Sequence, residues 1–353
     1  MAQSIIIMAG GTGGHVFPAL AVAQYLAAKE WDVSWIGTKR GMESRVVPAQ
    51  GIEMDWLAVE GLRGKGLGAK VNNLSLLIKS LWQSYKILRK RKPDVVLGFG
   101  GYVAGPGGLV AYFMGIPLVI HEQNRVPGST NRLLMNKANK VLEAFPNSFL
   151  KSIGAIFSGN PLRGHFLDFP EKQVWTDEAE REFRILVVGG SQGAKVLNDV
   201  VPVALAKLEN IEIKHQTGTV SLEQVAKKYA ELSVNAETVE FMTDIASAYQ
   251  WADIVICRAG AMTVSEVAAA GLPAIFIPLP HAIDDHQTAN AKYLVDAGAG
   301  ILIAQSDFDE ITLVMAIREM KESLKQMSEM AKKMAKLDAT VIVASICEAE
   351  VSK

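Results

Sequence analysis

The sequence predicts an α/β protein with two doubly wound, parallel-sheet domains that face each other across a cleft. Short apolar segments alternate with helical patterns along the chain, which is typical of a parallel sheet covered by helices. A glycine-rich turn follows an apolar strand in each half, at residues 10–15 and 189–194. The 353 residues are enough for two domains of about 150–200 residues each.

Composition supports this fold class and excludes several functions. Apolar residues make up 49% of the chain and aromatic residues only 7%, as expected for sheets buried on both faces. The net charge of −1 provides no overall positive field for nucleic acid. Cys257 and Cys347 lack metal-ligand spacing and indicate a reducing compartment. Without a signal-peptide pattern or a long uncharged apolar run, we expect a cytoplasmic protein that neither crosses a membrane nor binds nucleic acid.

In the first half, strands are expected where β-branched and apolar residues cluster, and helices where apolar residues recur every three or four positions. The expected strands are residues 4–8, 33–36, 95–98, 118–121, 141–144 and 155–157, and the expected helices are residues 18–29 and about 73–92. A domain boundary is expected near residues 159–163, before the charged stretch 168–184. This gives a first domain of residues 1–160 and a second of residues 161–337.

The second half repeats the alternation. The expected strands are residues 185–188, 211–215, 238–241, 254–257, 274–277 and 301–303, and the expected helices are residues 195–208, 220–232, 245–252, 263–270, 285–297, 310–336 and 339–349. A ligand site should lie beyond the carboxyl ends of these strands. The last helix, about residues 338–353, is expected to pack back on the first domain.

Both glycine turns can bring main-chain N–H groups to an anion at a helix N-terminus. Neither has Walker spacing or Gly-x-Gly-x-x-Gly in register, which argues against a nucleotide hydrolase and a dehydrogenase. His15 follows the first turn and should lie in the first helical turn, where an acid, a base or a phosphate donor could act. The alternative is that His15 caps its own loop.

Two further clusters end strands of the first half. Residues 98–108 contain many glycines, which indicates either close backbone approach or an anion-binding nest, or simply a tight turn into a helix. Residues 121–124, His-Glu-Gln-Asn, place Glu122 where it could be a general base or could cap the helix that begins near Ser129.

Other polar residues suit a nucleotide sugar. Arg163, on the turn 159–163, could hold a diphosphate with its forked donors, or could form a surface ion pair. Glu266 could accept both hydroxyls of a ribose, or could stabilise the dipole of its own helix. Gln287 could hydrogen-bond sugar hydroxyls.

In this order the motifs resemble those of glycosyltransferase family 28. The resemblance rests on residues 10–15, 100–102, 121–124, 159–163, 189–194 and 258–266, and it covers nearly the whole chain. It implies the two-domain GT-B fold and an inverting transfer of N-acetylglucosamine from UDP-N-acetylglucosamine to the muramyl C4 hydroxyl of lipid I, giving lipid II for peptidoglycan synthesis. Another GT-B transferase or epimerase, or a non-catalytic scaffold that binds a sugar nucleotide, is the alternative.

The resemblance also implies the site residues. UDP-N-acetylglucosamine is expected to contact Thr12, Gly13, Gly14, Asn124, Arg163, Ser191, Met242, Ala261, Met262, Thr263, Val264, Ser265, Glu266 and Gln287. Met242 would hold uracil through its main chain. His15 is the first candidate for the base and Glu122 the second, and the sequence does not choose between them. An Asp-x-Asp motif is absent from a suitable loop, so we expect no metal and no cofactor, with Arg163, Ser191 and helix amides stabilising the leaving group.

A lipid-linked acceptor requires contact with a membrane, and the helix expected near residues 73–92 suggests how. Its apolar residues recur at helical spacing beside many basic ones: Leu74, Leu77, Ile78, Leu81, Trp82 and Tyr85, with Lys70, Lys79, Lys86, Arg89, Lys90, Arg91 and Lys92. The alternative is an amphipathic helix packed on its own sheet. We expect a peripheral protein on the cytoplasmic side of the inner membrane, docked on anionic lipid, with other cell-wall synthesis proteins as candidate partners.

Overall fold

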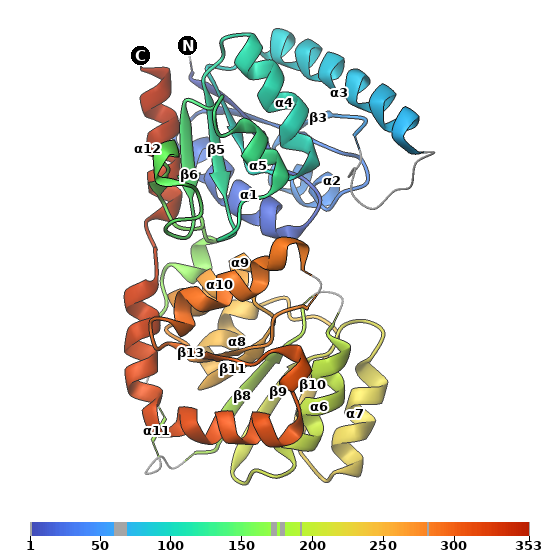
Figure 1. The fold of residues 1–353 in the computed structure, drawn as a ribbon, viewed down its shortest axis with the longest axis vertical. Coiled ribbons are helices and arrows are strands. Elements are labelled where there is room, and N and C mark those ends of the chain that lie inside the picture. The colour runs from blue at the N-terminus through green and yellow to red at the C-terminus, as the bar shows by residue number, and fades with distance from the viewer. Residues whose placement is uncertain are drawn as a thin grey trace. The chain divides into compact units, whose positions relative to one another are not determined.

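The computed structural model describes residues 2–59, 69–170, 175–176, 181–190, 193–280 and 282–352, with the backbone alone for residues 69–74 and 283. The chain forms two compact units, one of Met1–Arg163 with Lys336–Lys353 and one of Gly164–Ala335 (Figure 1). Each unit has its own parallel sheet with helices packed on it, so the predicted fold class of two Rossmann-like units is confirmed.

The first unit is built on a seven-stranded sheet in the order β3-β2-β1-β4-β5-β6-β7. Its strands are β1 (Ser4–Met8), β2 (Asp32–Gly37), β3 (Glu53–Trp56), β4 (Val95–Gly98), β5 (Leu118–Glu122), β6 (Lys140–Glu143) and β7 (Ile156–Phe157). All neighbours are parallel. The strand order reverses between β1 and β4, and ligands bind beyond such a switch point in open α/β sheets.

Helices cover both faces of this sheet. They are α1 (Gly13–Ala28), α2 (Glu43–Val46), α3 (Ala69–Arg91), α4 (Gly101–Phe113), α5 (Ser129–Leu134) and α12 (Ala339–Val351). Alternate residues of β1 enter different cores: Ile5 and Ile7 pack with α1 and α12, whereas Ile6 packs with residues of α3, α4 and α5. This alternation is the period of two expected for a strand buried on both faces.

In the first half, one predicted helix boundary was wrong and two elements were not predicted. The first helix starts at Gly13 rather than at Pro18, because the proline lies inside α1 instead of opening it. The glycine cluster at residues 98–108 forms most of α4, a 13-residue helix that contains Pro106. The strand β3 was not predicted, because its sequence Glu-Met-Asp-Trp has few of the residues that favour strands.

The second unit has a six-stranded parallel sheet in the order β10-β9-β8-β11-β12-β13. Its strands are β8 (Phe183–Val188), β9 (Ile211–Gln216), β10 (Ala236–Val239), β11 (Ile254–Cys257), β12 (Ala274–Phe276) and β13 (Gly300–Leu302). Its helices are α6 (Lys195–Leu205), α7 (Leu222–Glu231), α8 (Ile245–Trp251), α9 (Ala261–Ala269), α10 (His286–Val295) and α11 (Glu310–Met334). Strand β10 starts and ends two residues earlier than the predicted strand 238–241, whereas β8 and β11 follow the predicted positions closely.

The C-terminal helix α12 completes the first unit by packing against α1. Val343, Ala344 and Cys347 are buried in the core cluster that contains Ile5 and Ile7. Burial raises the pKa of the Cys347 thiol, so this cysteine stays protonated and unreactive. At the surface, Nζ of Lys29 donates to the Glu348 carboxylate at 2.9 Å.

Two valines of α12 provide a matched test of this packing. Val343 is 0% exposed and Val341 is 44% exposed on the same helix. We expect Val343→Ala to lower the free energy of unfolding of the first unit by about 1–3 kcal/mol, because it leaves a cavity in a close-packed core. Val341→Ala should change it by less than about 0.5 kcal/mol. Urea unfolding measures both, and equal effects would show that α12 is not part of this core.

Candidate active site

The first glycine turn is shaped to present main-chain groups at the start of α1. Gly11 has φ +98°, a conformation that only glycine adopts readily. Thr12 is extended, and α1 begins at Gly13 without a side-chain cap. His15 lies in the first turn of this helix, where its N–H donates to the carbonyl of Thr12 at 3.1 Å. A helix N-terminus built this way can bind an anion.

A buried carboxylate that was not predicted holds this turn in place. Oε2 of Glu43 accepts a hydrogen bond from the Gly11 N–H at 3.0 Å, and Oε1 accepts from the Thr38 N–H and hydroxyl at 2.9 and 2.8 Å. Glycines leave room for it: a Cβ added at Gly10 or Gly37 would lie 2.7 Å from the Glu43 side chain. The loop after β2 therefore fixes the turn after β1.

The third glycine cluster meets the first turn. Gly101, at φ +71°, begins α4, and a Cβ there would lie 3.1 Å from the Gly10 carbonyl oxygen and 3.6 Å from the His15 ring. The Tyr102 ring lies against Gly11. The contact follows from the pairing of β1 with β4, and close backbone approach is therefore what these glycines permit.

A chain of hydrogen bonds runs from His15 into the interior. Nδ1 of His15 is 2.7 Å from Oε1 of Gln123, and Nε2 of Gln123 is 3.0 Å from Nδ1 of His121. Nε2 of His121 is 2.9 Å from the carbonyl oxygen of Gly159. Burial lowers the pKa of His121 to about 4, against the opposing effect of the Gly159 carbonyl. His121 is therefore neutral at physiological pH.

Glu122 is enclosed by donors. Its Oε1 accepts from the main chain of Asn124 at 3.0 Å and from the side chain of Asn124 at 3.3 Å. Its Oε2 accepts from the Gly128 N–H at 3.0 Å and from the Asn131 amide at 2.8 Å. Only 2% of Glu122 is exposed. This carboxylate organises the loop that leads into α5.

The segment after β7 joins the same edge of the sheet. The Asn160 amide donates to the main-chain oxygen of Gln123 at 3.2 Å. The Arg163 guanidinium lies over the Phe17 ring, 4.9 Å from its centroid. Because Phe17 belongs to the second turn of α1, Arg163 lies near the helix end that begins with the glycine turn. The structure thus brings Thr12, Gly13, Gly14, His15, Asn124 and Arg163 to one edge.

In the second unit, Gln216 connects the second glycine turn to the predicted contact Met242. Its Nε2 donates to the carbonyl of Gly190 at 2.9 Å, and its Oε1 accepts from the N–H of Met242 at 3.0 Å. A nucleobase contact at Met242 would therefore use the carbonyl oxygen of that residue. Gly193 must be glycine, because a Cβ there would lie 2.2 Å from the Thr217 oxygen. Ser191 lies outside the described residues.

The other predicted contacts of this unit lie at the ends of β11 and β12. Helix α9 has no side-chain cap, and its first turn carries Ala261, Met262, Thr263 and Val264, followed by Ser265. Glu266 is the sixth residue of α9 and is nearly buried. Oε1 of Gln287 accepts from the Leu279 N–H at 3.0 Å. Arg258 donates to the carbonyls of Ile277 and Pro278, and so supports the sheet edge.

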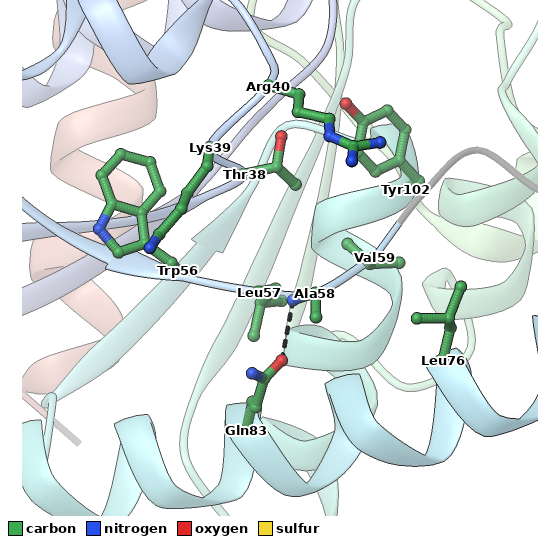
Figure 2. A pocket seen from close by; sticks show the side chains of 10 residues that line it. All are labelled: Thr38, Lys39, Arg40, Trp56, Leu57, Ala58, Val59, Leu76, Gln83 and Tyr102. Atoms are coloured by element: carbon green, nitrogen blue, oxygen red, sulfur yellow. Dashed lines mark hydrogen bonds between the residues drawn. The ribbon is translucent and has the colours of Figure 1, made fainter.

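A pocket of about 540 Å³, which no sequence pattern predicted, lies beside the first glycine turn (Figure 2). It is lined by the ends of β2 and β3 and by side chains of α3 and α4: Thr38, Lys39, Arg40, Trp56, Leu57, Ala58, Val59, Leu76, Gln83 and Tyr102. Gln83 accepts from the Ala58 N–H at 2.8 Å. Lys39 and Arg40 add positive charge to an otherwise largely apolar lining.

Among the residues that the structure describes, no cluster of three or more His, Cys, Asp or Glu side chains could hold a metal ion. The expectation that the chain works without a metal or cofactor stays a prediction.

Known proteins resemble the chain over its full length. The models of the glycosyltransferase family 28 N-terminal and C-terminal domains match residues 5–143 and 184–346. A relative from Methylococcus capsulatus, UDP-N-acetylglucosamine--N-acetylmuramyl-(pentapeptide) pyrophosphoryl-undecaprenol N-acetylglucosamine transferase, is 53% identical over 98% of both chains.

Solved structures agree with this similarity. The crystal structure of Acinetobacter baumannii MurG has a TM-score of 0.83 and 40% identity, with 98% of this chain and 99% of that chain covered. The UDP-GlcNAc 2-epimerase from Neisseria meningitidis, bound to UDP-GlcNAc, has a TM-score of 0.67 and 15% identity over 97% and 98% of the two chains. At that low identity the second likeness shows a shared fold alone.

Glu43 provides the test of how the first turn is held. We expect Glu43→Gln to lower the free energy of unfolding by about 1.5–3 kcal/mol, because the new amide turns an N–H₂ toward a main-chain donor that needs an acceptor. Glu53→Gln is the control, since Glu53 is an exposed carboxylate paired with Arg91. It should cost much less than Glu43→Gln, because exposed ion pairs contribute little to stability. Urea unfolding of both variants decides, and equal losses would contradict the role assigned to Glu43.

Proposed function

The chain belongs to glycosyltransferase family 28, and we propose that it transfers N-acetylglucosamine from UDP-N-acetylglucosamine to the muramyl C4 hydroxyl of lipid I, giving lipid II. The predicted family and its GT-B fold are confirmed by the matched domains and by the MurG structure. The observation that carries the proposed activity is the 53% identity to a transferase of that name over 98% of both chains. An epimerase activity is less well supported, because the solved epimerase structure shares only its fold with this chain.

We assign the acceptor to the first unit and the sugar nucleotide mainly to the second. In the second unit the proposed contacts are Ser191, Met242, the start of α9 with Glu266, and Gln287. For the contacts that the structure describes, support comes from their placement beyond strand ends of a parallel sheet, where nucleotides bind in this class of fold. Arg163 and the α9 amides would stabilise the negative charge that develops on the departing UDP.

His15 is the base in this proposal. Direct displacement requires a group that removes the proton of the acceptor hydroxyl while the oxygen attacks the anomeric carbon and UDP leaves. Glu122 is a poorer candidate because four donors already surround its carboxylate. His15 stands beside two helix N-termini, those of α1 and α4, which can bind the acceptor diphosphate.

Contact with the membrane is proposed for an exposed face of α3. Ile78, Trp82 and Tyr85 are 61%, 56% and 41% exposed, whereas Ser80 and Ser84 on the same helix are buried. An amphipathic helix that only packs on its own sheet would show the reverse. The Lys86 ammonium lies 3.5 Å above the Trp82 ring centroid, so basic and aromatic groups share this face. Such a mixture binds anionic lipid surfaces.

None of the helices in the described part of the chain combines the length and apolar character of a membrane span. With the exposed face of α3 as its membrane contact, we propose a peripheral location on the cytoplasmic face of the inner membrane. The pocket of Figure 2 suits the lipid diphosphate of the acceptor, because its apolar wall includes α3 while Lys39 and Arg40 are cationic. Contacts with other cell-wall synthesis proteins remain part of the proposal.

The activity is tested with labelled UDP-N-acetylglucosamine and a lipid I analogue. We expect transfer of the label to the acceptor, much weaker transfer from UDP-N-acetylgalactosamine, and a loss of about 100-fold or more in kcat for His15→Asn, since a general base contributes about 10²–10⁴-fold. The KM for UDP-N-acetylglucosamine should change little. Epimerised or merely bound nucleotide without transfer would contradict the proposal, and full turnover by His15→Asn would exclude His15 as the base.

The α3 face is tested with two isoleucines of equal exposure. Ile78 of α3 is 61% exposed, and Ile311 of α11 is 60% exposed. In flotation with vesicles containing phosphatidylglycerol, Ile78→Glu should reduce binding by about 10-fold, because it places a carboxylate in the apolar contact. Ile311→Glu should bind like the unaltered protein. Equal binding of both variants would refute the assignment.

A further inference from the structure

The carbonyl oxygen of Gly159 lies at the edge of the first sheet and, like any carbonyl oxygen, can only accept a hydrogen bond. His121 Nε2 lies 2.9 Å from it and must therefore carry a proton. His121 is completely buried and stacked against the Phe99 ring at a centroid distance of 5.0 Å. Since burial keeps the ring neutral, its Nδ1 has no proton and must accept a hydrogen bond.

The side-chain amide of Gln123 donates the hydrogen bond that Nδ1 of His121 accepts. Its Nε2 lies 3.0 Å from Nδ1 of His121 and also 3.0 Å from the main-chain oxygen of His121. Both are acceptors, so only the amide N–H₂ can face them. The same choice turns Oε1 toward His15, at 2.7 Å from its Nδ1. The Asn160 amide, which donates to the main chain of Gln123, helps to hold the residue in place.

The orientation of Gln123 determines the proton position on His15. Because Oε1 can only accept, Nδ1 of His15 must donate, and a neutral ring then has its lone pair on Nε2. We propose that Gln123 and His121 are positioning residues that hold His15 in the Nδ1–H tautomer and leave Nε2 as the proton-accepting atom. This inference rests on the proposed function for its chemical meaning.

The proton balance of the transfer is consistent with this arrangement. Nε2 takes the proton of the C4 hydroxyl, the oxygen forms its bond to the anomeric carbon, and the bond between that carbon and UDP breaks. The resulting imidazolium still donates from Nδ1 to Gln123. No proton moves along the hydrogen bonds from His15 to Gly159. The hydrogen-bonded residues therefore orient the base and do not conduct protons.

The other titratable groups near the hydrogen bonds of His15, Gln123 and His121 contact other partners. Glu122, next to His121 in sequence, accepts from Asn124, Gly128 and Asn131. Glu43 accepts from Gly11 and Thr38. The Arg163 guanidinium lies over Phe17, and Tyr102 packs on Gly11. A carboxylate introduced at position 123 would therefore be the closest new charge to His15.

The tautomer can be observed without turnover. In ¹⁵N-histidine-labelled protein, long-range ¹H–¹⁵N spectra at pH 8 distinguish the two neutral tautomers, and the His15→Asn variant assigns the His15 signals. We expect the Nδ1–H form in the unaltered protein and a shift toward the Nε2–H form in Gln123→Leu. Gln24→Leu, an exposed position further along α1, should leave the spectrum unchanged. The Nε2–H form in the unaltered protein, or no change in Gln123→Leu, would overturn the inference.

Kinetics provide a second readout that a purely structural role would not move. Gln123→Leu should lower kcat by about 10- to 100-fold with an unchanged KM for UDP-N-acetylglucosamine, since part of the contribution of an oriented base is lost. Gln123→Glu should move the acidic limb of the kcat/KM profile to higher pH, because its carboxylate stabilises protonated His15. An unshifted limb would contradict the contact. If the unaltered protein shows the expected tautomer but no transfer, the proposed function fails and the positioning role stands.

Discussion

The carbonyl of Gly159 determines how the polar side chains at the carboxyl edge of the first sheet are arranged. It fixes the proton of His121, which fixes the amide of Gln123, which fixes the ring of His15. The steps at His121 and Gln123 are strict because both side chains are buried, and a wrongly placed donor there would remain without a partner. A base whose orientation is fixed in advance needs no reorganisation when the acceptor arrives.

Two buried carboxylates also hold polar groups of this unit in place by accepting hydrogen bonds. Glu43 and Glu122 lie beside the first glycine turn and after β5, and each accepts three or four hydrogen bonds from nearby donors. Those bonds offset the large cost of removing a charge from water. The surroundings of both carboxylates make them supports for loops, which is why His15 rather than Glu122 is the proposed base.

The sequence predicted the elements that depend on local pattern. Strand β1, the glycine turn and the position of His15 in the first helical turn follow from apolar periodicity and turn chemistry. Glu43 could not be found in this way, because Gly11 lies 32 residues from it and no local signal marks the contact. Helix α4 was missed since its glycines and Pro106 disfavour helices, and the glycines are explained by close packing against β1, His15 and α5. The link from Gln216 to Met242 likewise depends on strand neighbours.

The two units repeat one topology but present different chemistry at their strand ends. The first offers His15, two helix N-termini and an exposed apolar and basic helix face, whereas the second offers the N-terminus of α9 and a nearly buried Glu266. The central claim is an inverting transfer to the muramyl C4 hydroxyl. NMR analysis of the purified disaccharide product tests it most directly. A β-1,4 linkage is the predicted result, and an α linkage or attachment at another hydroxyl would contradict the account.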